Sequence, residues 1–271
     1  MRPMRLAVLA VLALAVPLFG QPLAVVATSG VFGDLVQAVG GEAVTVTTLI
    51  PAGFCPAHYD LRPSDLLAVA RAELVLYHGI EPWLERLLGN VNPGAKVLGL
   101  KGAWNTPEPL AEKARAVAQA LAELQPVRAE YFGERLEAFL SDLSAVAAEL
   151  LGRAEELGVA EVPAIVMQWQ ADFAKWLGLK VVATYPPEER LSLRDLADLA
   201  QKGREAGAKL VIDNLQSGIS FGSRLAQAIG AFHVVVTNFP GPIPGAVDLL
   251  TMFRVNADLV FAAAEAAKEG K

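Results

Sequence analysis

The sequence has few of the residues that cross-link a chain or bind metal ions. It contains a single cysteine, Cys55, and three histidines in 271 residues. One cysteine cannot form an internal disulfide, so the hydrophobic fraction of 54% must supply the core. Positive charge is also scarce, with a formal net charge of −6. An acidic balance argues against nucleic acid and anionic membrane surfaces as partners.

The first 20 residues have the order of a secretory signal peptide. Arg2 and Arg5 precede an uncharged run, and a small residue, Gly20, closes the segment. The run is about 14 residues long, shorter than the roughly 20 that span a bilayer, although an uncleaved anchor is the alternative. No cysteine follows the run, so no lipobox cysteine is expected. We therefore expect an exported protein, periplasmic or extracytoplasmic.

The rest of the chain alternates between short apolar runs and segments with helical spacing. The runs are rich in β-branched residues and end in small or polar ones, which is typical of buried parallel strands. The expected strands fall within residues 22–30, 43–50, 72–79 and 95–100, and again within 163–168, 180–185, 209–214 and 232–238. This alternation predicts two α/β lobes, each with a parallel sheet covered by helices.

A segment without strand signals separates the two halves. Residues 126–158 are dense in Ala, Leu, Glu and Arg, and they predict one helix of about 30 residues, or roughly 45 Å. A helical hairpin broken at Gly133 is the alternative. We expect lobes at 21–125 and 159–271 joined by this helix, with a ligand cleft at the carboxyl ends of the strands.

Several stretches together resemble one known family. They are "VVATSGVFGDLVQAVGG", "PAGFCPAHYDLRPSDLLAVARAELVLYHG", "NTPEPLAEKARAVAQALAELQP" and "FAKWLGL". In order and context they are similar to the extracytoplasmic substrate-binding proteins of zinc- and manganese-uptake ABC transporters. The resemblance implies a TroA-like solute-binding fold of two parallel-sheet α/β lobes joined by one long rigid helix. It also implies a divalent transition metal (zinc or manganese) as cargo, an ABC permease as partner, a monomer and no catalysed reaction.

The metal ligands that the resemblance implies are largely replaced in this chain. The family pattern Asp-Pro-His becomes Cys55-Pro56-Ala57-His58, in which the histidine is displaced by one residue. A family histidine before a tryptophan is absent in front of Trp104. The other positions implied for ligands carry neutral residues, Met167 or Gln168 and Asn238. Cys55 and His58 are therefore the predicted metal-binding residues.

The loops expected at the cleft are rich in neutral amides. Amides are poor zinc ligands but fix polar organic molecules through paired donors and acceptors. The predicted ligand-binding residues are Asp60, Trp104, Gln168, Gln170, Asn214, Gln216 and Asn238, with further apolar walls expected from Tyr59, Trp169 and Phe239. Besides a metal ion, the cargo alternatives are a polar organic solute or a chelated metal. A non-transport adhesion or regulatory protein on the same fold is a third hypothesis.

The remaining histidines and one acid have other interpretations. His78 ends an expected strand and is interpreted as supporting its loop, and His233 as structural. Asp213 is expected either at the cleft or as a helix cap. A Cys55–His58 hydrolase is disfavoured, because residues three apart in one turn seldom align a nucleophile with its base and no orienting residue can be named.

Overall fold

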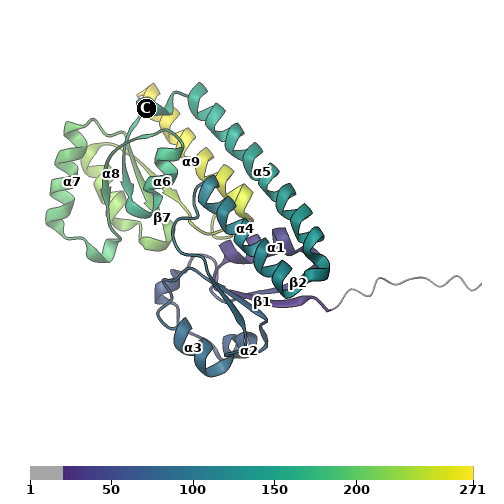
Figure 1. Cartoon of the computed structure of the whole chain (residues 1–271). Coiled ribbons are helices and arrows are strands. Elements are labelled where there is room, and N and C mark those ends of the chain that lie inside the picture. Colours follow the sequence, from purple (N-terminus) through teal and green to yellow (C-terminus); the bar gives the residue numbers. More distant parts are fainter. Residues whose placement is uncertain (1–20, 271) are drawn as a thin grey trace, which may run out of the picture.

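The computed structural model describes residues 21–270, which form two α/β lobes beside a long helix pair (Figure 1). In the N-terminal lobe four parallel strands lie in the order β2-β1-β3-β4. These strands are β1 (Leu23–Ala27), β2 (Val44–Thr48), β3 (Leu74–Tyr77) and β4 (Lys96–Gly99). The helices of this lobe are α1 (Gly30–Gly40), α2 (Pro63–Arg71) and α3 (Leu84–Val91).

The C-terminal lobe repeats the design. Its four parallel strands have the order β6-β5-β7-β8, which matches the first sheet position for position. The strands are β5 (Pro163–Met167), β6 (Lys180–Tyr185), β7 (Leu210–Asn214) and β8 (Phe232–Val236). The helices are α6 (Ala171–Trp176), α7 (Leu193–Glu205), α8 (Ser220–Ile229) and α9 (Leu249–Glu269). The prediction of two parallel-sheet α/β lobes is confirmed.

One long helix connects the lobes. After α4 (Pro107–Leu124), α5 (Ala129–Glu156) runs for 28 residues without interruption, which is about 42 Å. The hairpin alternative is wrong, because α5 continues through Gly133. Figure 1 shows α9 lying along α5, where exposed ion pairs join Arg254 to Glu149 and Arg153 to Asp258. Exposed pairs of this kind contribute little individually.

The connection depends mainly on the core. Successive residues of a strand face opposite sides of its sheet, so Val25 and Val26 belong to different clusters. One continuous cluster runs from the inner face of the first sheet, past Phe132 of α5, to Phe253 of α9 and the second sheet. Smaller clusters lie under α2 and α3 and under α7 and α8. A shared core of this kind holds the lobes at a fixed spacing.

Membrane insertion has no candidate in the part of the chain that the structure describes. No helix within residues 21–270 is both long and apolar enough to span a bilayer. The predicted signal peptide, residues 1–20, lies outside the described residues.

Candidate ligand-binding cavity between the lobes

A cavity of about 330 Å³ lies between the lobes, where the carboxyl ends of both sheets meet. Its walls come from the loops after β2, β3 and β4 on one side and after β5, β7 and β8 on the other. The size falls within the roughly 300–1,000 Å³ of small-molecule pockets. The fold thus brings together the polar residues that follow six strands.

The lobes touch directly beside this cavity through the loop after β4. The Trp104 indole Nε1–H donates to the Asn238 carbonyl at 2.9 Å. The next residue, Asn105, donates from Nδ2 to the Trp169 carbonyl at 2.8 Å. Both bonds run from the N-terminal lobe to the C-terminal lobe, so residues 104 and 105 hold the two lobes together along one edge of the cavity.

Aromatic rings form the apolar part of the wall. His78 lies between Phe32, stacked at 4.0 Å between ring centroids, and Trp104 at 4.2 Å. Phe239 contacts both His78 and Trp104. Trp169 lies at the cavity with 53% of its surface exposed. Such rings provide flat apolar contact area for an organic ligand.

A buried network supports the loop that carries His78. The His78 Nε2 and the Ser29 hydroxyl are 2.6 Å apart, and the Thr28 hydroxyl donates to Glu81 at 2.6 Å. The Glu81 carboxylate also accepts the backbone N–H groups of residues 78, 79 and 80. Burial, together with nearby Lys113, lowers the pKa of His78 to about 3. His78 is therefore neutral at physiological pH, and its ring joins the loop after β3 to Ser29 in the loop after β1.

On the C-terminal side, amide side chains bond to one another. Gln170 is completely buried, and its Nε2 donates to Asn238 Oδ1 at 2.9 Å and to Asn214 Oδ1 at 3.3 Å. Asn214 Nδ2 donates in turn to the Ser217 hydroxyl at 2.8 Å. Each amide is therefore held in one orientation by a residue from another strand end.

A second chain of hydrogen bonds fixes the backbone beneath these amides. Gln216 donates to the Thr237 hydroxyl at 2.9 Å and accepts the Asn238 backbone N–H at 3.2 Å. Asn256 of α9 accepts from Thr237 N–H and donates to its carbonyl. The segment after β8 is therefore fixed on both sides before any ligand binds.

The cavity contains little charge. Its ionisable lining residues are Cys55, His78 and Asp172, and Asp172 is exposed. Within the described residues 21–270, no group of three or more His, Cys, Asp or Glu is arranged to hold a metal ion. A bare dication would therefore have only one carboxylate among these residues to neutralise it.

Of the two predicted metal-binding residues, only one lines the cavity. Cys55 lines the cavity. His58 is exposed at the end of a 3₁₀ turn, Pro56–His58, and is not among the residues that line the cavity. Asp60 is likewise exposed and does not line it. The histidine that shares the cavity with Cys55 is His78.

Most of the predicted ligand-binding residues do meet at the cavity. The lining includes Trp104, Gln168, Asn214, Gln216 and Asn238. Gln170 instead lies behind the wall as the anchor of the amides, and Tyr59 is buried against Asp65. Of the expected apolar walls, Trp169 and Phe239 are present.

Sequence reasoning missed several residues at this cavity, among them Ile80, Asn105 and Asp172. Each lies a few residues after a strand end, which is the signal that identified the others.

Asp213 has a structural role beside the site. It is 1% exposed and accepts hydrogen bonds from Tyr185 Oη at 2.5 Å and from His233 Nε2 at 2.7 Å. Burial, followed by the Asp213 charge, raises the pKa of Tyr185 far above its usual range. The cleft and helix-cap interpretations of Asp213 are replaced by a role in joining β6, β7 and β8.

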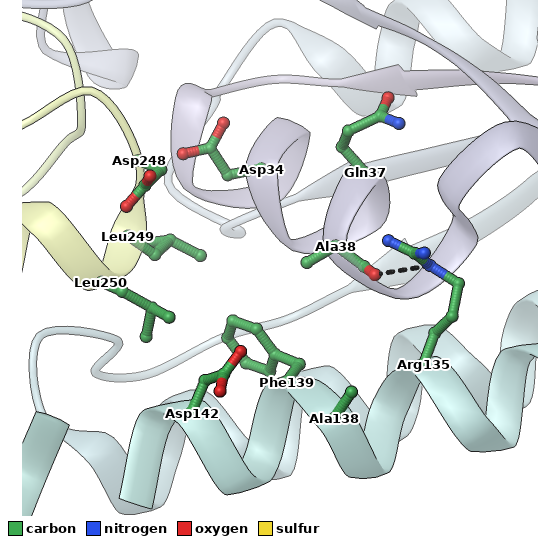
Figure 2. Close-up of a pocket in the computed structure, with 10 residues that line it drawn as sticks. All are labelled: Asp34, Gln37, Ala38, Arg135, Ala138, Phe139, Asp142, Asp248, Leu249 and Leu250. Atoms are coloured by element: carbon green, nitrogen blue, oxygen red, sulfur yellow. Dashed lines mark hydrogen bonds between the residues drawn. The ribbon is translucent and has the colours of Figure 1, made fainter. Parts of the chain in front are cut away.

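A second cavity of about 440 Å³ lies on another face, between α1, α5 and the start of α9 (Figure 2). Figure 2 shows Asp34 of α1 beside Asp248, which caps α9 through the Thr251 N–H. Burial and the Asp248 charge raise the pKa of Asp34 to about 6. This cavity is away from the strand ends, and its carboxylates belong to the contact between lobe and helix.

Two lobes with matching parallel sheets, a long connecting helix and a cavity between the strand ends define a two-lobed α/β architecture. The chain belongs to the family described as zinc-uptake complex component A, periplasmic, whose pattern matches residues 25–263.

Relatives with names in this class match part of the chain. The manganese-binding lipoprotein MntA of Halalkalibacterium halodurans is 30% identical over 141 residues, 46% of this chain and 47% of that protein. The metal ABC transporter substrate-binding lipoprotein ScbA of Streptococcus cristatus is 27% identical over 151 residues, 46% of this chain and 49% of that protein. In these matches the chain spans about half the length of each relative.

Solved structures share the fold over nearly the whole chain. The crystal structure of ZnuA superimposes with a TM-score of 0.77 at 23% identity, covering 90% of this chain and 99% of that one. The Mn-bound periplasmic metal binding protein from Candidatus Liberibacter asiaticus gives 0.78 at 17% identity, with 89% and 98% covered.

Proposed function

We propose that this protein is the extracytoplasmic substrate-binding component of an ABC importer, and that it captures cargo in the cavity between its lobes. The observation that carries the proposal is this cavity at the carboxyl ends of both sheets, in a chain of the zinc-uptake component A family. Its partner is the permease of the importer, and the protein works as a monomer that catalyses no reaction.

The first candidate cargo is a divalent transition metal, zinc or manganese. Family membership and the metals named for similar proteins support it. Cys55 is the predicted metal-binding residue at the cavity, since it lines the wall. His58 takes part only if its loop turns inward from the exposed position.

Elemental analysis tests the metal cargo. The protein is exported from a bacterial host, purified without added chelators and analysed for zinc and manganese, beside a Cys55→Ser, His58→Ala double variant. We expect about one metal per chain in the parent protein. Loss of metal in the double variant supports the two predicted ligands, while unchanged metal assigns binding to other residues. A metal-free parent that also takes up no zinc or manganese in titration contradicts this cargo.

A metal-free polar organic solute is the second candidate cargo. Neutral amides and aromatic rings at the cavity support it, because they bind organic surface well and cations poorly. Native mass spectrometry of the same preparation tests it. A bound mass that contains no metal supports this candidate, and a bound mass equal to one metal ion contradicts it.

A further inference from the structure

The amide orientations at the cavity determine which atoms a ligand meets. Asn238 accepts from Gln170 through Oδ1, and its Nδ2 donates no hydrogen bond within residues 21–270. Asn238 lines the cavity whereas Gln170 lies behind it. The atom engaged with Gln170 is thus turned away, and Asn238 presents N–H donors to the cargo.

Two neighbouring amides already use their oxygens as hydrogen-bond acceptors. The Asn214 amide is used at both ends, by Gln170 and by Ser217. The Gln216 amide is used at both ends by Thr237 and by the Asn238 backbone N–H. Three of the amide oxygens that line the C-terminal wall therefore already accept protein hydrogen bonds, and they are poor candidates for coordinating a cation.

The free groups that remain are of mixed kind, and they include His78 Nδ1, which is buried without a hydrogen-bond partner in the described part of the chain. Asn105 uses Nδ2 on the Trp169 carbonyl, which leaves its Oδ1 as an acceptor, and no side-chain hydrogen bond engages Gln168 among the described residues. With Asn238, the cavity thus presents donors and acceptors together, between aromatic walls. This is the pattern that fixes an organic molecule having both kinds of group.

The volume and the charge of the cavity also favour an organic ligand. The cavity volume of about 330 Å³ is an order of magnitude larger than the roughly 30 Å³ that one water molecule occupies in the liquid. A bare ion, which is of similar size to a water molecule, would leave most of the cavity empty. Asp172 is the one carboxylate in the lining, so the cavity suits a ligand with little net charge.

We infer that the cavity binds a small organic molecule of amino-acid type, alone or as the chelator around a transition metal, and contacts this organic part rather than a bare cation. The inference rests on the proposed function, since it assumes that the cavity is the cargo site. A carboxylate oxygen of the ligand accepts from Asn238 Nδ2, an N–H group donates to Asn105 Oδ1, and the apolar part lies against Trp104 and Trp169.

Calorimetric titration with three probes tests the inference on the full mature chain. The probes are a zinc salt alone, L-histidine alone, and the neutral complex of one zinc with two L-histidine molecules. We expect the complex or free histidine to bind at least tenfold more tightly than zinc alone. Tighter binding of the complex identifies a chelated cargo, and tighter binding of free histidine identifies the organic molecule itself.

Asn238→Asp is the matched variant. It keeps the oxygen that Gln170 binds but replaces the N–H donors with a carboxylate, so the organic probe should weaken at least tenfold while zinc alone strengthens. Asn90→Asp, the same change at an exposed residue of helix α3, is the control and should alter neither affinity.

The outcomes separate the inference from the proposed function. Zinc alone binding at one per chain, as tightly as the complex, overturns the inference and leaves metal capture standing. The reverse amide orientation would turn Asn238 Oδ1 towards the cavity and would give this result. An Asn238→Asp protein with unchanged preference also overturns the inference. If no probe binds, both the inference and the metal cargo fail.

Discussion

The two sides of the cavity are built differently. On the C-terminal side, the amide wall, defined as Gln170, Asn214, Gln216 and Asn238, is joined side chain to side chain across three strand ends. On the N-terminal side, the His78 loop is fixed by the buried Glu81 carboxylate, but the loop 51–60 that carries Cys55 is held by local backbone bonds, such as Phe54 N–H to Pro51 C=O and His58 N–H to Cys55 C=O.

This difference separates a preorganised surface from an adaptable one. The amide wall has its donors and acceptors fixed before the ligand arrives, so binding there costs little ordering. Within the described residues, loop 51–60 has no such side-chain bonds to other strand ends, and its exposed part around His58 opens at lower free energy than the amide wall. We expect the amide wall to select the cargo and the loop 51–60 to adjust to it. The predictions below test this contrast, from the largest effect to the smallest.

Truncating the anchor of the amide wall should give the largest effect. Gln170→Ala leaves a cavity and removes the N–H group that donates to the Asn214 and Asn238 side chains. We therefore expect a loss of about 2–4 kcal/mol in unfolding free energy. Urea denaturation followed by circular dichroism measures it. Gln168→Ala, at a partly exposed neighbour, is the control and should change stability by less than about 0.5 kcal/mol. Equal effects of the two variants would contradict a preorganised wall.

His78 should make the N-terminal lobe sensitive to acid. Its pKa is about 3 in the fold, against 6.5 for a histidine free in water. Between these values the unfolded chain binds more protons, so the stabilising contribution is complete above pH 6.5 and is lost as pH falls. From pH 6.5 to about 5 this loss is about 2 kcal/mol, because each unit of pKa difference corresponds to about 1.4 kcal/mol.

The His78→Gln variant isolates this contribution. Glutamine keeps a side-chain group for Ser29 but does not titrate. Urea denaturation of both proteins at several pH values should show that the difference in unfolding free energy, parent minus variant, shrinks as pH falls from about 7 to about 5. A difference that stays constant with pH would show that burial does not hold His78 neutral.

The fold could be predicted because its signals are local. Eight short apolar runs and one long helical segment correspond to eight strands and α5. The same reasoning found the strand ends that carry Asn214 and Asn238. It could not find the role of Gln170, because its partners lie 44 and 68 residues away and the direction of an amide depends on them.

His58 and His78 illustrate the same limit of prediction from the sequence. Cys55 and His58 are close in sequence, but the 3₁₀ turn between them leaves His58 exposed. His78 is distant in sequence, yet β3 is adjacent to β1, so His78 meets Ser29 from the loop after β1 and reaches the cavity. Spacing along the chain could not reveal that His78, and not His58, lies at the cavity with Cys55.

A further prediction concerns Asp34, which lies beside Asp248 in the second cavity, between α1, α5 and the start of α9 (Figure 2). The negative charges of the two carboxylates repel each other. The raised pKa of about 6 means that the fold binds more protons than the unfolded chain between about pH 4 and 6, so this contribution to stability falls as pH rises. Asp34→Asn removes the charge and should stabilise the protein at about pH 7 by about 1 kcal/mol, after allowance for partial exposure. Thermal unfolding at about pH 7 and about pH 4.5 measures it, and the gain should be clearly smaller at the lower pH.

The smallest effect is expected in the loop 51–60. His58 is exposed, and its side chain makes no hydrogen bond or ion pair with the residues that the structure describes. His58→Ala should therefore change the unfolding free energy by less than about 0.5 kcal/mol. The same titrations with zinc and with the zinc–histidine complex then report on the loop itself. Unchanged affinity would show that His58 stays outside the bound site. A tenfold loss confined to zinc alone would show that the loop turns inward to bind a bare ion, and the adaptable side of the cavity, rather than the amide wall, would then select the cargo.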